Sequence, residues 1–144
     1  MQIRLFFMLL FVFTVTAVSG VEVFGTLKIA HQSASVVTEY NVFLTLSNGK
    51  QVKYLGPISF TKAERGMYQN EYRFKNLSAL QNYQLLVRIY PKNDQSQYFS
   101  KTFNLNAEKW QTMLNAGEIT VAKTGSGNHD FKVTRKGIVM PSKK

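Results

Sequence analysis

Apolar and polar residues alternate with a period of two along most of the chain after residue 20. The pattern is clearest at Tyr83, Leu85, Val87 and Ile89, and it recurs in segments such as 21–29, 40–46 and 118–122. Successive side chains of a β-strand point to opposite faces, so this alternation predicts strands with one buried face. Turn signals separate these segments at intervals of roughly 8–12 residues. We therefore expect an all-β fold, a two-sheet antiparallel β-sandwich of seven to eight strands.

A hairpin is expected after the segment that begins at Tyr40. Asn48-Gly49 lies between that segment and residues 51–55. Asparagine and glycine both accept the positive φ of a type I′ turn, so this pair is a strong hairpin signal. The two segments should therefore pair as neighbouring antiparallel strands.

One short helix is expected near residues 107–115. Asn106 can cap the first turn, and Trp110, Met113 and Leu114 follow at the spacing of a single apolar helix face. Gly117 is a typical residue at which a helix ends. We interpret the apolar stripe as core packing and not as a ligand site.

The segment 74–87 resembles the tyrosine corner of immunoglobulin-like and fibronectin type III-like sandwiches. Leu77 precedes Tyr83 by six residues, and Leu85 and Val87 continue the following strand. In that corner the tyrosine ring packs at the end of the sandwich and its hydroxyl bonds back to the backbone. The resemblance implies structural roles for Leu77 and Tyr83.

A second resemblance lies near the start of the apolar alternation. Residues 23–27, with Gly25 in the middle, and residues 42–49, which end in Asn-Gly, are similar to the transthyretin-like or carboxypeptidase-regulatory-like sandwich. Both resemblances hold at the level of the superfamily. Because such folds carry many functions, they imply a binding or scaffolding module by analogy alone.

The N-terminus has the pattern of a secretory signal peptide. Arg4 is followed by an apolar run, Leu5 to Val18, and by the small residues Ser19 and Gly20. We expect a signal peptide at 1–20, cleaved after Ser19 or Gly20, and an uncleaved anchor is the alternative. The run of about 14 residues is shorter than the roughly 20 that span a bilayer. The expected divisions are then a sandwich domain at 21–134, a basic C-terminal tail at 135–144, and no transmembrane span after cleavage.

This pattern directs the protein to the exterior of the cell, the periplasm or the lumen of the secretory pathway. The sequence leaves open whether its source is bacterial or eukaryotic. Asn76-Leu77-Ser78 fits the N-glycosylation acceptor pattern, so Asn76 is a candidate for glycosylation if the source is a eukaryote.

Few residues are suited to catalysis or to metal binding. The chain has no cysteine and two histidines, His31 and His129. The absence of cysteine excludes disulfide scaffolds, thiolate zinc sites and cysteine nucleophiles. Asp130 follows His129 directly, and neighbouring strand residues face opposite ways, so spacing alone does not make them a catalytic pair. We expect no catalytic, metal or cofactor site and a protein that is not an enzyme.

Charge is the other distinctive feature of the composition. The whole chain carries a formal net charge of +10, and basic residues dominate its C-terminal part. This stretch is either a solvated tail or a binding site for an acidic glycan or another anionic surface. The absence of a nucleic-acid motif argues against DNA or RNA as a partner. The polyanion-binding candidates are Lys123, Lys132, Arg135, Lys136, Lys143 and Lys144.

We expect the exported domain to bind or assemble with a protein partner, with polyanion binding as the alternative. The supporting feature is a set of large apolar side chains at positions that the alternation places on exposed faces. These residues are Phe24, Tyr54, Leu86 and Tyr90. If they are contiguous, such a patch would mark an interface.

Overall fold

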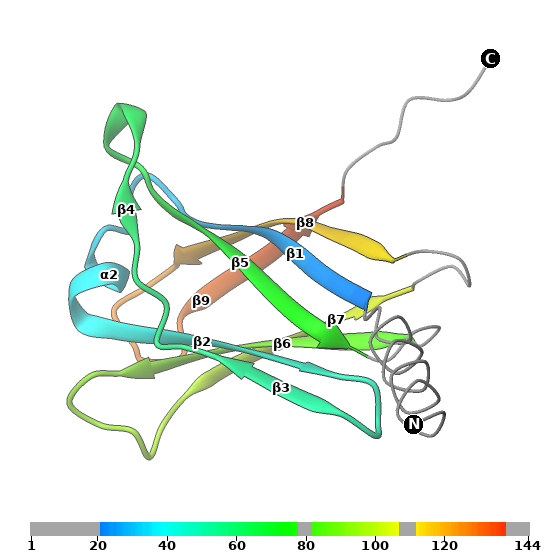
Figure 1. Cartoon of the computed structure of the whole chain (residues 1–144). Helices are drawn as coiled ribbons and strands as arrows, with labels where there is room; N and C mark the ends of the chain where they lie inside the picture. Colours follow the sequence, from blue (N-terminus) through cyan, green and yellow to red (C-terminus); the bar gives the residue numbers. More distant parts are fainter. Residues whose placement is uncertain (1–20, 78–81, 107–111, 138–144) are drawn as a thin grey trace, which may run out of the picture.

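The computed structural model describes residues 21–77, 82–106 and 112–137, which form two β-sheets packed against each other (Figure 1). The five-stranded sheet has the order β4-β5-β1-β8-β9. Its strands are β1 (Val21–Ile29), β4 (Thr61–Lys62), β5 (Tyr68–Leu77), β8 (Met113–Lys123) and β9 (Phe131–Lys136). The two-sheet all-β class expected from the alternation is confirmed.

The four-stranded sheet has the order β3-β2-β6-β7, and all of its pairs are antiparallel. Its strands are β2 (Tyr40–Ser47), β3 (Val52–Leu55), β6 (Tyr83–Pro91) and β7 (Phe99–Leu105). The hairpin expected at Asn48-Gly49 is confirmed, since Ser47 pairs with Val52. Gly49 has a φ of 89°, and the Asn48 side chain accepts hydrogen bonds from the amides of Lys50 and Gln51.

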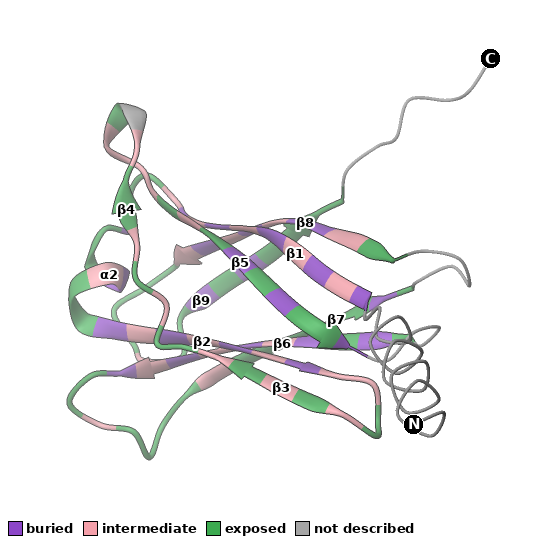
Figure 2. Cartoon of the chain, viewed as in Figure 1, coloured by how far each residue is buried: buried purple, intermediate pink, exposed green. Residues whose placement is uncertain are grey.

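The core lies between the sheets and follows from the alternation. Along β1 and β2, buried residues alternate strictly with less buried ones (Figure 2). The buried side chains of both sheets form a single cluster, which includes Leu27, Leu44, Leu85 and Ile119. Apolar burial of this kind is the main stabilising term in a chain that has no disulfide.

One pairing departs from the antiparallel pattern. β1 lies in the middle of its sheet, antiparallel to β5 and parallel to β8. The β1–β8 ladder contains a β-bulge, because Phe24 pairs with Asn115 while Thr26 pairs with Glu118. Gly117, in the bulge, has a φ of 85°, a conformation that glycine adopts without strain.

The structure corrects the helix expected near residues 107–115. Residues 107–111 lie outside the described part of the chain, but Met113 and Leu114 belong to β8. Gly117 lies within that strand instead of ending a helix. The bulge is the physical reason, because an inserted residue shifts the alternation by one position and hides the strand from a pattern with period two.

The short helix that the structure does contain is α2 (Ser35–Glu39), between β1 and β2. Val36 anchors it in the core, and the buried Ser33 hydroxyl accepts a hydrogen bond of 2.8 Å from the Lys123 amide. A single 3-10 turn, η1 (Glu64–Gly66), connects β4 to β5. No helix among the described residues is long and apolar enough to cross a membrane.

Leu77 ends β5 in one sheet and Tyr83 begins β6 in the other. Both side chains are buried in the core cluster. The Asn48 side chain is hydrogen-bonded to the Tyr83 phenol, and this bond lowers the pKa of Tyr83, although burial raises that pKa by more. Tyr83 is thus buried at the start of β6, while its role as a tyrosine corner and the superfamily both stay predictions.

Candidate functional site

The outer face of the four-stranded sheet carries a cluster of aromatic side chains around one arginine. We call this surface the aromatic face and define it by Phe43, Tyr54, Arg88, Tyr90 and Tyr98. The Phe43 and Tyr90 rings meet edge to face at 5.5 Å, and the Tyr90 and Tyr98 rings lie 5.0 Å apart. Tyr54 is 73% exposed and Tyr98 is 43% exposed. No second layer of the described chain covers this surface.

The backbone places these side chains on one side of the sheet. On β2 and β6 the buried positions face the core, so the positions between them face outward. Phe43 pairs with Arg88 across the β2–β6 ladder, and Thr45 pairs with Tyr54 across the β2–β3 ladder. Tyr98 precedes β7, and its ring lies 5.5 Å from the Arg88 guanidinium.

A small cleft opens within the aromatic face. It has a volume of about 270 Å³ and is lined by Phe43, Thr45, Tyr54, Arg88, Tyr90 and Gln95. The Nε atom of Arg88 is buried there and has no hydrogen-bond partner. The cleft therefore combines aromatic walls with a cation whose hydrogen-bonding capacity is not used up.

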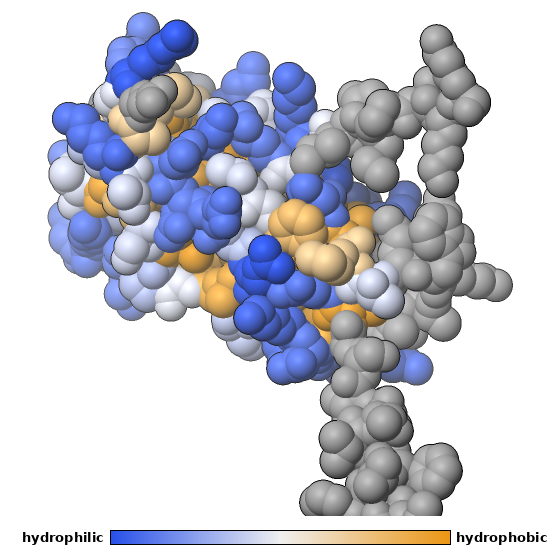
Figure 3. Space-filling model, turned by 45° about the horizontal axis from the view of Figure 1, so that its top comes forward, coloured by the Kyte–Doolittle hydropathy of each residue, from blue (hydrophilic) through white to orange (hydrophobic). Residues whose placement is uncertain are grey.

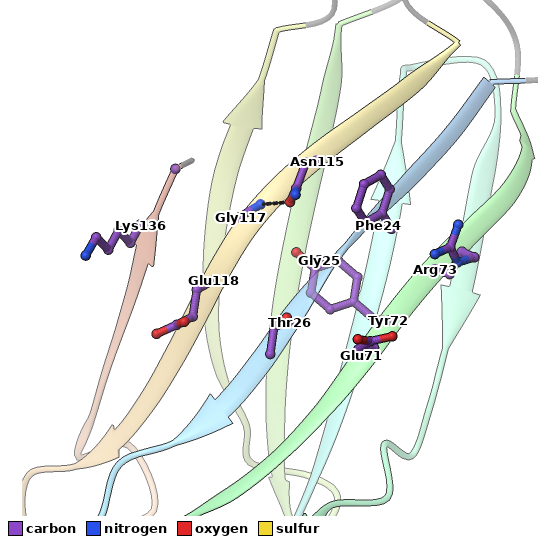
Figure 4. Close-up of a pocket in the computed structure, with 11 residues that line it drawn as sticks. Phe24, Gly25, Thr26, Glu71, Tyr72, Arg73, Asn115, Gly117, Glu118 and Lys136 are labelled. Atoms are coloured by element: carbon purple, nitrogen blue, oxygen red, sulfur yellow. Dashed lines mark hydrogen bonds between the residues drawn. The ribbon is translucent and has the colours of Figure 1, made fainter. Parts of the chain in front are cut away.

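The outer face of the five-stranded sheet carries a larger groove, with a volume of about 650 Å³ (Figure 4). It runs over the β8 bulge, between β5 and the end of β9. Its walls carry both signs of charge, and Lys136 points away from the middle of the groove (Figure 4). Its lining residues include Phe24, Glu71, Arg73, Asn115, Glu118 and Lys136.

Two of the charged side chains that line this groove already form ion pairs within the protein. Arg73 contacts Glu22 at 2.8 Å and also lies over the Phe24 ring, and Glu118 contacts Lys28 at 2.8 Å. Seen partly from this side, the surface is largely hydrophilic with smaller apolar areas (Figure 3). Arg73 and Glu118, two of the charged side chains that line the groove, are therefore already engaged within the protein.

The buried side of this groove is shaped by Tyr72. Its ring reaches from β5 across β1 at Gly25 toward β8 (Figure 4). The hydroxyl is buried without a hydrogen-bond partner, and burial raises the pKa of Tyr72 far above its ordinary value, while Arg135 lowers that pKa by less. A β-carbon on Gly25 would lie 2.4 Å from this hydroxyl. Gly25 is thus required by the close approach of the tyrosine.

The polyanion-binding candidates within the described residues do not gather on one surface. Arg135 and Lys136 are the last residues of β9, two positions beyond the boundary expected for the sandwich domain. Lys132 and Lys136 lie on the outer face of the sheet, whereas Nε of Arg135 donates a 2.6 Å hydrogen bond to the Ala116 carbonyl. Lys143 and Lys144 lie outside the described residues.

Lys123 has an internal role at one end of the sandwich. Its ammonium group lies 4.8 Å from the centre of the Phe131 ring and 5.4 Å from that of Tyr40, and it donates to the Gly127 carbonyl. Cation–π contacts of this kind stabilise the ring cluster that they cover. This lysine is therefore less available to a polyanion than a freely solvated one.

The two histidines and Asn76 lie on the surface. His31 and His129 are both exposed, and the Asp130 carboxylate accepts a hydrogen bond from the Gly127 amide. No cluster of three potential metal ligands occurs among the described residues. Asn76 is exposed and has a φ of 58° where β5 bulges against β1, so its side chain is open to modification.

The sequence pointed to part of the aromatic face. Tyr54, Leu86 and Tyr90 lie on this side of the four-stranded sheet, but Phe24 lies on the opposite side of the molecule. Phe43 and Arg88 were missed, although the alternation in β2 and β6 could have identified them. Tyr98 precedes its strand and carries no such signal.

No known protein family, curated protein or solved structure matches this chain.

Proposed function

We propose that this chain is an exported, non-enzymatic binding module that recognises a protein partner through the aromatic face. The observation that carries the proposal is the cluster of the exposed Tyr54 and Tyr98 and the half-buried Tyr90 around Arg88. Tyrosine and arginine are enriched among the residues that dominate binding energy at protein interfaces. The signal-peptide pattern at residues 1–20 supports the exported location.

Polyanion binding receives less support from the arrangement of the basic residues. Of the candidates within the described part of the chain, Lys123 and Arg135 have internal partners. Exposed ion pairs are individually worth less than about 1 kcal/mol, so a polyanion site needs several cations acting together. We therefore favour a protein partner.

The proposal is tested by capture followed by reconstitution. The immobilised protein is used to capture partners from an extract of the native host, and each captured protein is then purified and its affinity measured directly. The double variant Tyr54→Ser/Tyr98→Ser should lose at least about tenfold in affinity, since two interface aromatics are removed.

Met113→Ser is the matched control, because Met113 is 50% exposed but belongs to the five-stranded sheet. It should bind as the unaltered protein does. If the purified partner binds the double tyrosine variant with full affinity, the aromatic face is not the interface. If the captured molecules are glycans, the partner class is wrong.

A further inference from the structure

We propose that Arg88 is the anchor of this interface and that it receives the carboxylate of an aspartate or glutamate side chain from the partner protein. This inference rests on the proposed function and names the chemistry of the partner. The observation behind it is a cation held in an aromatic cleft without a carboxylate of its own.

The charge of Arg88 is not neutralised within the described part of the chain. Arg88 forms no ion pair there, and its Nε has no hydrogen-bond partner. Asp94 lies on the loop that follows β6. Its carboxylate accepts hydrogen bonds from the amide and hydroxyl of Ser96. A partly buried arginine in this state gains from any carboxylate that reaches its remaining donors.

The aromatic rings hold the guanidinium in place before a partner arrives. The Tyr98 ring lies over Cζ, and Tyr98 in turn packs against Tyr90, which packs against Phe43. A guanidinium fixed in this way loses little conformational freedom when it forms a two-pronged contact with a carboxylate. Arginine is therefore specifically suited to this position, and lysine is not an equivalent replacement.

The size of the cleft favours an inserted side chain over a free small ligand. Its volume of about 270 Å³ lies below the range of about 300–1,000 Å³ that is typical of small-molecule sites. Thr45 and Gln95 add polar groups to its lining. A carboxylate on a short stem can reach the arginine while the neighbouring residues of the partner lie on Tyr54 and Tyr90.

Charge complementarity supports an acidic residue in particular. Arg88 is the only charged side chain among the outward-facing strand positions of the four-stranded sheet that the structure describes. The chain as a whole is strongly basic, with a formal net charge of +10. Both the long-range field and the local anchor therefore attract an acidic protein surface.

The test uses two capped tripeptides of defined sequence, acetyl-Phe-Glu-Phe-amide and acetyl-Phe-Gln-Phe-amide, together with methyl glucuronide. Each is titrated into the ¹⁵N-labelled protein, and the Arg88 Nε–H signal and the backbone amides of β2 and β6 are followed by NMR. We expect the glutamate peptide to shift the Arg88 signal saturably and to bind about tenfold more tightly than the glutamine peptide, because one charge-assisted contact is lost in the latter.

Arg88→Gln and Arg88→Lys should both reduce binding of the glutamate peptide to that of the glutamine peptide. The thermal midpoint of each variant is measured alongside, since an arginine that forms no ion pair within the described residues can be replaced without unfolding the sheet. Loss of binding in a variant that keeps its midpoint assigns the anchor to the guanidinium.

Three outcomes overturn the inference. If both peptides shift the aromatic face with equal affinity, the face binds peptide without a carboxylate anchor, and the proposed function stands without this inference. If methyl glucuronide alone shifts Arg88, the occupant is an acidic sugar, and both proposals fail. If none of the three probes shifts Arg88 at millimolar concentration, the anchor is wrong, and the capture experiment alone decides the function.

Discussion

At the scale of single residues, the pair Gly25 and Tyr72 shows how one missing side chain shapes a layer of the core. Tyr72 faces the core from β5, and its ring crosses β1 where Gly25 has no side chain. The ring thereby reaches the bulge in β8, and its hydroxyl arrives there without a hydrogen-bond partner. The close packing of the Tyr72 ring thus leaves its hydroxyl oxygen without a hydrogen bond.

Gly25→Ala should destabilise the protein by about 2 kcal/mol, as overpacking of a filled core does. The new methyl would lie 2.4 Å from the Tyr72 hydroxyl and 2.5 Å from the Gly117 carbonyl oxygen. Urea unfolding measures the change. Gly137→Ala is the control, because a β-carbon there has no neighbour within 4 Å. Equal stability of the two variants would contradict the close approach.

Tyr72→Phe should leave the free energy of unfolding unchanged or raise it by up to about 1 kcal/mol. The substitution removes a buried hydroxyl that has no partner, together with its cost of desolvation. The same urea titration measures this effect. A loss of stability greater than about 1 kcal/mol would show that the hydroxyl has a bonding partner, such as a buried water.

The tyrosines also predict sensitivity to alkali. Burial raises the pKa of both Tyr72 and Tyr83 above the ordinary value of 10.0. Above that pH the unfolded chain releases phenolic protons that the folded protein retains, so the free energy of unfolding falls as pH rises from about 10. Urea midpoints between pH 8 and about 11 measure the decline. Tyr72→Phe should decline less steeply, and an identical slope would contradict the burial of this phenol.

At the scale of the elements, the chain passes from one sheet to the other between the end of β5 and the start of β6. Tyr83 begins β6 and is 2% exposed. Tyr83→Ala should cost about 3 kcal/mol or more, since truncation of a buried aromatic leaves a cavity. Urea unfolding measures the loss, and Tyr83→Phe isolates the hydrogen bond to Asn48. An unchanged midpoint in Tyr83→Ala would disprove the corner assignment.

The elements also show which parts of the fold could be predicted from the sequence. Period-two alternation identified β1, β2 and β6. Each of these strands is long, and each has one face buried in the core. The alternation did not identify the start of β8. Ala116 and Gly117 are consecutive buried residues at the bulge, so the alternation of buried and exposed positions is broken there. The parallel β1–β8 pairing leaves no local signal, since its two strands are far apart in the chain.

The aromatic face was partly predictable for the same reason. Positions that alternate with buried ones must face outward, which selects Tyr54, Leu86 and Tyr90. The role of Arg88 in the aromatic face depends on its contact with the Tyr98 ring, and Tyr98 lies outside the strands. Sequence spacing does not contain that contact.

At the scale of the whole molecule, positive charge is spread over several sides. Lys132 and Lys136 lie on β9, Lys50 follows β2 and Lys62 ends β4. The positive field of the protein is therefore a property of the entire surface and not of one patch.

Retention on a heparin column tests this distribution. Lys132→Gln/Lys136→Gln and Lys50→Gln/Lys62→Gln remove the same charge from different places, so both should lower the eluting salt concentration by similar amounts. Such interactions are screened within a Debye length of about 8 Å in physiological salt. A much larger effect of the first pair, or of Lys143→Gln/Lys144→Gln, would locate a polyanion site in the C-terminal stretch and revive that function.

The central position of β1 has a consequence for the order of folding. β1 is the first strand of the described chain, yet its two neighbours are β5 and β8, so Ile29 pairs with both Tyr68 and Val121. Closing such distant contacts is slow, and proteins dominated by them fold in milliseconds to seconds. During synthesis, β1 can pair with β5 first, but its other edge therefore stays unpaired until β8 has emerged. The middle of the five-stranded sheet is completed late, by the last third of the chain.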